Sequence, residues 1–309
     1  MGIMYRQQVY TCGDYKQVRF YTVATVRRPA RRKPHTKPTS AAQLWINQRW
    51  RQDKLTRLLN ANFTGTDYEI HLTYSPGSQP TSADGVVRDV QNYNRRVRYA
   101  CSRAGLSPPL YIWVPEGDGI KRRFHIHMTI QACLPRETLE ALWGTVVGAD
   151  DSEVGSLVFS KQLRFDRNGV EGLAKYVTKE SREELEQMQI DPESGEVTDA
   201  PTGSPFKKAY YCSRGLKNPQ AEVSVVSQKA VVDMCTVEAG SREPLEKRFP
   251  GWEMAEAHPF FDEKSARWFL YATMYRRGSF MSRVRGEEIE RQRQRGRPPE
   301  PPDDDDLPW

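Results

Sequence analysis

Cysteine is scarce in this chain, with five residues among 309. No two of them form a C-x-x-C pair, and their odd number argues against a disulfide framework. We therefore expect reduced thiols in a cytosolic protein. The five are Cys12, Cys101, Cys133, Cys212 and Cys235.

Long apolar runs are also lacking. No stretch approaches the ~20 apolar residues that a membrane-spanning helix needs, and no signal-peptide pattern opens the sequence. Hydrophobic residues make up 38% of the chain, enough for a globular core with polar appendages. We expect no membrane partner.

Positive charge is in modest excess. The chain has 46 Lys and Arg residues and 40 Asp and Glu residues, for a net charge of +6. The final stretch "PPEPPDDDDLPW" (298–309) is acidic, so the rest of the chain is more basic than the total indicates. A basic surface favours a polyanionic partner, nucleic acid first. A solvated surface without a partner would have the same composition.

A basic, proline-broken segment, "RRPARRKPHTKP", covers residues 27–38. Proline prevents a regular helix here. The segment is either an extended arm that follows a phosphate backbone or a solvated linker. Its candidate DNA-contacting residues are Arg27, Arg28, Arg31 and Arg32.

Periodicity predicts the order of elements along most of the chain. We expect strands at 18–26, 68–74, 109–117, 123–130 and 156–165, and helices at 39–60, 82–105, 135–147 and 170–188. From residue 68 onward the order is strand, helix, strand, strand, helix, strand, helix. This order is typical of an α+β, ferredoxin-like or RNA-recognition-type domain, with an antiparallel sheet and helices on one face.

The rest of the chain is harder to assign. Residues 221–240 look like at least one further element, and the aromatic pattern of 260–285 predicts a helix. High charge density and prolines after Arg285 predict disorder. The expected organisation is an N-terminal strand with a basic arm (1–38), the main domain (39–220), an accessory region (221–285) and a tail (286–309).

Two histidines stand one residue apart in "KRRFHIHMTI" (121–130). Because strand side chains alternate, His125 and His127 share one face, and the flanking apolar residues share the other. This spacing suits two ligands of one metal ion, although a His-x-His pair on an amphipathic strand often has no function. A third ligand would be Glu116 at the end of the preceding strand, or Asp118 nearby.

The direction of Glu116 is the weak point of this metal site. By alternation Glu116 shares a face with Ile112 and Val114, which look like core residues. We therefore expect that Pro115 bulges the strand and redirects Glu116 toward the histidines. Mixed nitrogen and oxygen ligation suits Mn²⁺ at least as well as Mg²⁺.

A candidate nucleophile lies on the predicted helix that starts at residue 170. Tyr176 and Lys179 are neighbours on one flank of that helix, and Lys175 adds a second cation. A phenol with a pKa near ~10 is a poor nucleophile at neutral pH. A nearby ammonium and a metal-polarised phosphate would favour its attack.

Three motifs in this order resemble those of the HUH-superfamily rolling-circle replication initiators. They are "HLTYSP" (71–76), "FHIHM" (124–128) and "YVTK" (176–179). The flanking "NANFTGTDYEIHLTY", "GLAKYVTKE" and "YYCSRGLKNP" are most similar to initiators of integrative elements, small plasmids and phages, and the resemblance covers roughly residues 40–220. The single tyrosine of the third motif marks the one-tyrosine branch.

The resemblance implies a function and a site. His125, His127 and Glu116 would bind Mg²⁺ or Mn²⁺, and Tyr176 would attack a DNA phosphodiester, leaving a 5′-phosphotyrosine and a free 3′-hydroxyl. The expected substrate is single-stranded or hairpin origin DNA in the cytoplasm of a bacterial host. Since no P-loop pattern occurs, unwinding would fall to a host helicase and other host replication proteins. His71 departs from the family pattern and receives no role.

Other side chains are candidates for holding DNA. Arg122 and Arg123 precede the metal-site strand and can hold phosphates. Tyr111 and Trp113 either stack on bases or pack under a helix.

Rival functions remain open. "HLT" (71–73) and "HMT" (127–129) resemble the paired motifs of metal-free two-histidine phosphoesterases, which open cyclic nucleotide phosphates. A HUH transposase or relaxase would use the same chemistry in another pathway. A non-catalytic nucleic-acid-binding module would carry aromatic residues where the histidines stand.

Overall fold

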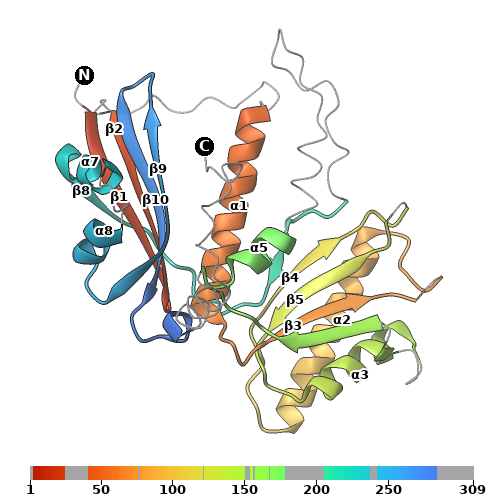
Figure 1. Ribbon diagram of the computed structural model, residues 1–309. Coiled ribbons are helices and arrows are strands. Elements are labelled where there is room, and N and C mark those ends of the chain that lie inside the picture. The colour runs from red at the N-terminus through yellow and green to blue at the C-terminus, as the bar shows by residue number, and fades with distance from the viewer. Residues whose placement is uncertain are drawn as a thin grey trace, which may run out of the picture. The chain divides into compact units, whose positions relative to one another are not determined.

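The computed structural model describes residues 3–24, 41–75, 77–120, 122–149, 154–155, 157–166, 168–177, 205–236 and 242–283 (Figure 1). The chain divides into two compact units. Unit 1 comprises Met1–Ala61, Phe165–Gly172 and Lys217–Trp309, and unit 2 comprises Asn62–Arg164 and Leu173–Leu216. Each unit contains a five-stranded antiparallel sheet, so the fold is α+β, as predicted.

The sheet of unit 2 contains β3 (Tyr68–Thr73), β4 (Tyr111–Glu116), β5 (His125–Ile130), β6 (Val158–Gln162) and β7 (Tyr211–Cys212). Their order across the sheet is β6-β3-β5-β4-β7. The first four strands of the unit therefore lie in the order fourth, first, third, second, which is the ferredoxin-like arrangement that the sequence predicts.

Two helices cover one face of this sheet. Helix α2 (Ala83–Arg103) begins at Ser82, whose side chain accepts the Gly85 N–H, as N-cap residues do. Helix α3 (Arg136–Val147) ends at Gly148, whose φ of 71° is the left-handed conformation typical of helix ends. Their apolar stripes bury Val90, Tyr93 and Trp143 against inward-facing sheet residues such as Ile126. The opposite face of the sheet carries the polar residues of the site.

The sheet of unit 1 has the order β8-β1-β2-β10-β9. Its strands are β1 (Ile3–Cys12), β2 (Tyr15–Ala24), β8 (Glu222–Val226), β9 (Trp252–Asp262) and β10 (Arg267–Arg276). Its helices are α1 (Ala41–Asn62), α7 (Gln228–Thr236) and α8 (Arg242–Arg248). Val231 of α7 and Leu245 of α8 lie in one core with sheet residues such as Phe20.

The prediction of a helix over residues 260–285 is wrong, because this segment contains the end of β9 and all of β10. Strand β10 lies between β2 and β9, and residues 270–275 are buried in succession. A strand that is buried on both faces has a continuous apolar run, which periodicity does not distinguish from a buried helix.

Several predictions concern residues that the structure does not describe. The basic arm at 27–38 and the tail at 286–309 lie outside the described residues, as does the predicted helix after residue 177. The short helix α5 (Glu171–Val177) is described, but its last two residues only by their backbone. Among the described helices, none combines the length and the apolar character required to cross a membrane.

Candidate metal centre

Strand β5 presents its two histidines on the face opposite the helices, as predicted. Ile126, Met128 and Ile130 lie in the core under α2 and α3. His125 and His127 alternate with them, and their ring centroids are 5.2 Å apart. The side chain of His127 is only 3% exposed and that of His125 is 33% exposed, so one side of the pair opens toward solvent.

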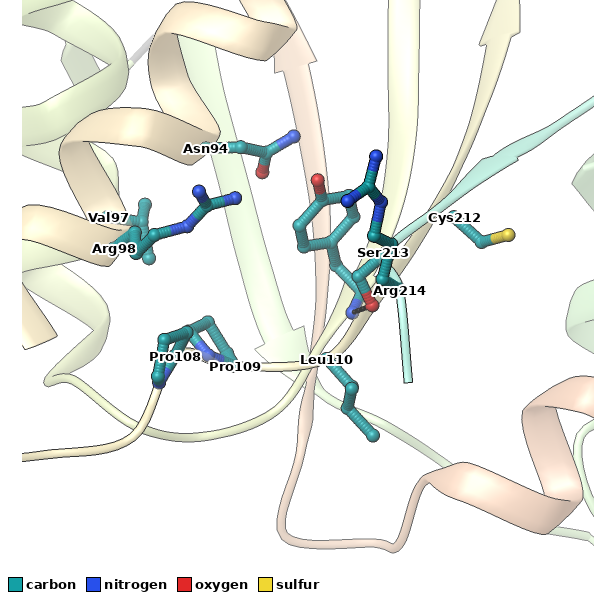
Figure 2. Close-up of a pocket in the computed structure, with 10 residues that line it drawn as sticks. Asn94, Val97, Arg98, Pro108, Pro109, Leu110, Cys212, Ser213 and Arg214 are labelled. Carbon is teal, nitrogen blue, oxygen red and sulfur yellow. Dashed lines mark hydrogen bonds between the residues drawn. The ribbon is translucent and has the colours of Figure 1, made fainter. Parts of the chain in front are cut away.

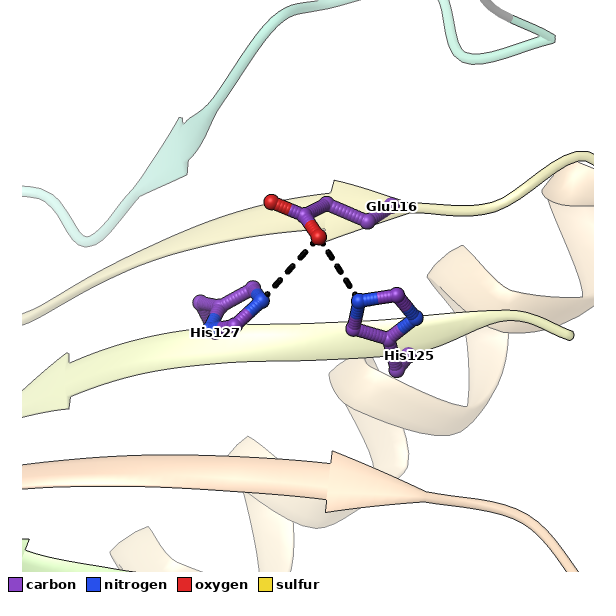
Figure 3. A group of neighbouring side chains, drawn as sticks. All are labelled: Glu116, His125 and His127. Atoms are coloured by element: carbon purple, nitrogen blue, oxygen red, sulfur yellow. Dashed lines mark hydrogen bonds and ion pairs between the residues drawn. The ribbon is translucent and has the colours of Figure 1, made fainter. Parts of the chain in front are cut away.

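Glu116 joins the histidines from the neighbouring strand (Figure 3). Its Oε2 lies 2.7 Å from Nε2 of His125 and 3.2 Å from Nε2 of His127. Glu116 and His125 are direct cross-strand partners, which places their side chains on one face. The three side chains therefore form one cluster.

The predicted bulge at Pro115 is wrong. The pairing of β4 with β5 runs without a register shift from Tyr111 to Glu116. Ile112 and Val114 share the face of Glu116, as alternation requires, and both are buried there. The apolar residues of β4 thus do not mark a single core face, because both faces of the strand are covered.

Asp118, the alternative ligand, has a structural part in the turn after β4. Its Oδ1 accepts the N–H groups of Ile120 at 2.7 Å and Arg122 at 3.0 Å. Gly117 precedes it with φ of 89°, and a Cβ there would lie 2.2 Å from the carbonyl oxygen of Arg123. Only glycine fits this close approach, which brings the β4 end back toward β5.

The electrostatics of the cluster favour an ionised carboxylate. Burial by itself raises the pKa of Glu116, but the hydrogen bond with His125 and the close contact with His127 outweigh it and lower this pKa to about 2. A carboxylate with such a low pKa is ionised at neutral pH and can therefore bind a cation.

The donor set fits a divalent metal ion. All three ligand atoms lie within 4.8 Å of one another. Ligands at ~2.0–2.2 Å from an ion, as for zinc and magnesium, stand on the order of 3 Å apart when the angle at the ion is near 90°. The observed 2.7 and 3.2 Å separations are of that size. Two nitrogens and one oxygen leave further coordination positions open.

Further polar residues lie beside the cluster on β3 and β6, the strands that follow β5 on the side away from β4. Nε2 of His71 lies 3.2 Å from Nδ1 of His127 and 3.0 Å from Oε1 of Glu69. Burial raises the pKa of Glu69, but the contacts with His71 and Lys161 prevail and lower it. The amino group of Lys161 lies 3.3 Å from Glu69.

The metal site predicted from the sequence included no role for His71, Glu69 or Lys161. Alternation within "YEIHLTY" already puts Glu69 and His71 on one face of β3. The missing information was the β3–β5 register, in which His71 pairs directly with His127. Register between strands distant in sequence is set by tertiary packing and not by the local pattern.

The other predicted site residues are described only in part. Tyr176 belongs to α5 by its backbone, its side chain lies outside the described part, and Lys179 lies outside the described residues. Lys175 is half-buried on α5, whereas Arg122 and Arg123 are exposed beside the β4–β5 turn. The predicted roles of these residues stay predictions.

Trp113 lies on the helix side of β4, opposite the metal cluster. It is buried in the core and stacks on Tyr211, with ring centroids 4.1 Å apart. Tyr111 is half-buried on the same side. For Trp113, the packing interpretation is the correct one.

Comparisons with known proteins complete this picture. The sequence model of one family, described as replication-associated protein ORF2/G2P, matches residues 67–181. This segment contains the whole cluster of Glu116, His125 and His127, and also Tyr176. The comparisons with curated proteins and with solved structures found no match.

Proposed function

We propose that this chain, whose residues 67–181 match the model of the replication-associated protein ORF2/G2P family, is a rolling-circle replication initiator that nicks and rejoins one strand of origin DNA. The observation that carries the proposal is the Glu116–His125–His127 cluster on the face of a ferredoxin-like sheet opposite its helices. A metal-ligand cluster inside the family segment favours a nuclease over a passive DNA-binding module.

Glu116, His125 and His127 would hold Mg²⁺ or Mn²⁺. When bound, the ion would polarise a DNA phosphate and neutralise charge that develops on it. The protein's own residues fix where this happens, because both imidazoles and the carboxylate sit on adjacent strands in fixed register.

Tyr176 is the proposed nucleophile. Its phenolic oxygen forms a bond to phosphorus, and the bond from phosphorus to the 3′-oxygen breaks. The phenol loses its proton, and the departing oxygen gains one to become a 3′-hydroxyl. The products are a 5′-phosphotyrosine and a primer end. Lys179 would stabilise the negative charge on the phosphate.

The covalent link retains a phosphodiester bond, so rejoining requires no nucleotide. A later attack by a 3′-hydroxyl on the phosphotyrosine reverses the first step. The proposed partners are single-stranded or hairpin origin DNA, with a host helicase for unwinding.

A denaturing gel tests this proposal. Labelled single-stranded oligonucleotides that tile the DNA around the encoding gene are incubated with the protein and Mn²⁺. We expect a covalent adduct with wild type, no adduct with Tyr176→Phe or His127→Ala, and a normal adduct with the control Tyr99→Phe, an exposed tyrosine of α2. An adduct that survives Tyr176→Phe would exclude Tyr176 as the nucleophile.

A second candidate function uses the histidines without a metal. His71 and His127, each followed two residues later by threonine, lie in contact on adjacent strands, as a two-histidine phosphoesterase would require. However, the Thr73 hydroxyl donates to the carbonyl oxygen of Leu157 at 3.0 Å. Hydrolysis of a 2′,3′-cyclic nucleotide that persists in a chelator would favour this alternative.

A further inference from the structure

Unit 2 contains a cavity of about 720 Å³ that the proposed nicking mechanism does not use (Figure 2). It lies between α2, the loop that leads into β4, and the turn after β7. Its volume falls within the ~300–1,000 Å³ range of ligand pockets. Cys212 at the end of β7 and the turn that follows it form the "CSR" of "YYCSRGLKNP", a motif to which the metal centre gives no role.

Two arginines enter this cavity from different elements. Figure 2 shows Arg98 extending from α2 and Arg214 extending from the turn after β7. Within the described part of the chain, neither guanidinium forms an ion pair with a carboxylate. Two guanidinium groups that line one cavity without a paired carboxylate are suited to bind an anion.

The backbone fixes the position of Arg214. The Ser213 N–H donates to the Tyr111 carbonyl at 2.9 Å, and the Tyr111 N–H donates to the Ser213 Oγ at 3.0 Å. This reciprocal pair holds the turn after β7 against β4. Arg214 is therefore presented from an ordered turn and not from a free loop.

A buried amide supplies an independent indication of a ligand. Asn94 of α2 is only 7% exposed and lines the cavity. Its Oδ1 is buried and has no hydrogen-bond partner among the described residues. Buried polar atoms are nearly always satisfied, so a ligand with a hydrogen-bond donor would complete this site.

The remaining wall is apolar and rigid. Pro108, Pro109 and Leu110 line the side of the cavity below the polar groups. The Tyr111 phenol also lines it; burial raises its pKa, and the nearby charge of Arg98 opposes that rise. The cavity thus combines two arginine side chains, an amide, a neutral hydroxyl and an apolar wall.

We propose that this cavity binds one phosphorylated nucleoside unit of single-stranded DNA, with its phosphate on Arg98 and Arg214 and its base against Pro108 and Pro109. The inference rests on the proposed function for the identity of the DNA. Tyr111 and Glu116 lie at opposite ends of β4, about 17 Å apart at ~3.3 Å per residue. The cavity therefore contributes to DNA binding and not to bond cleavage.

Fluorescence anisotropy of a labelled mixed-sequence single strand, in a chelator so that no cleavage occurs, tests this site. Arg98→Ala and Arg214→Ala are each expected to weaken binding about tenfold, as loss of a charge-assisted hydrogen bond does. The matched control is Arg96→Ala, an exposed arginine of α2 outside the cavity, which should change affinity less than about twofold. If the double variant Arg98→Ala/Arg214→Ala binds as the control does, the proposal is overturned.

Two further titrations distinguish single-stranded DNA from a free nucleotide and from free phosphate as the ligand of the cavity. Titration with dAMP and with inorganic phosphate by calorimetry identifies the source of the phosphate. Binding of dAMP that is tighter than that of the oligonucleotide, and lost in the double variant, would overturn the assignment to single-stranded DNA in favour of a free nucleotide.

The cavity and the nicking function can fail separately. If wild type forms no adduct but the double variant loses strand binding, the nicking proposal fails and the cavity proposal stands. If wild type forms the adduct and the double variant binds DNA normally, the cavity proposal fails and the nicking function stands.

Discussion

Nδ1 of His127 lies 3.2 Å from Nε2 of His71, while Nε2 of His127 lies 3.2 Å from Glu116. Both ring nitrogens of the buried histidine are thus contacted, one by the ligand cluster and one by β3. Metal-bound histidines commonly have such a partner on the second nitrogen, which fixes the ring's orientation. His71 therefore stands where a positioning residue of the metal centre would be.

The first prediction concerns His71. His71→Ala should weaken Mn²⁺ affinity about 10- to 100-fold, the usual effect of losing an outer partner of a ligand, without changing the number of ions bound. His71→Gln, which keeps a hydrogen-bonding group, should recover part of the loss. The loss of the free Mn²⁺ signal in electron paramagnetic resonance measures both quantities.

The matched control is His258→Ala, because His258 belongs to unit 1 and contacts Glu256 at 3.5 Å instead of the cluster. An unchanged affinity in His71→Ala would show that His127 needs no support from β3.

The second prediction concerns acid. The pKa of Glu116 is about 2 in the folded protein and 4.5 in its ordinary state. Because the folded value is the lower one, Glu116 stabilises the fold above about pH 4.5, and this contribution disappears as the pH falls toward 2. Its size is up to about 3 kcal/mol.

Urea unfolding between pH 5 and pH 3, without metal, measures this effect. Wild type should lose more unfolding free energy over that interval than Glu116→Gln, which has no carboxyl group to protonate. Parallel pH profiles for the two proteins would contradict the assignment of the depressed pKa.

Strands covered on both faces limited what the sequence could predict. The alternation in β5 is clear because one face is apolar and the other polar, so the shared face of His125 and His127 was predicted correctly. In β4 and β10, apolar residues occupy both faces. There the pattern led to an unnecessary bulge at Pro115 and to a helix in place of β10. The same reasoning applies to His71, whose neighbour across the sheet depends on register.

The third prediction concerns the turn that sets Glu116. Gly117→Ala should destabilise unit 2 by about 3 kcal/mol or more, because its φ of 89° is unfavourable for alanine and the new Cβ would meet the Arg123 carbonyl at 2.2 Å. Relief of the clash would move Glu116, so Mn²⁺ affinity should fall as well. Urea unfolding and Mn²⁺ titration measure the two effects.

Gly77→Ala is the matched control for Gly117→Ala. Gly77 has nearly the same φ, 87°, but no atom of the described residues lies within 4 Å of the position that the new methyl group would take. It should lose only about 1 kcal/mol and keep its Mn²⁺ affinity. Equal effects of the two substitutions would mean that backbone strain alone, and not the close approach of β5, explains the glycine at 117.

The last prediction concerns metal binding and folding together. Mn²⁺ at 100 times its dissociation constant should stabilise unit 2 by about 2.7 kcal/mol, since the ion binds the folded cluster and not the unfolded chain. The gain should shrink as the pH is lowered, because protons compete with the metal for the imidazole nitrogens. His127→Ala and Glu116→Ala should abolish this gain, whereas His258→Ala should retain it.

Urea unfolding with and without Mn²⁺, monitored by hydrogen exchange of β3, β4 and β5 amides, assigns the stabilisation to this sheet. Protection that rises equally in β2 and β10 would instead locate the metal outside the Glu116–His125–His127 cluster.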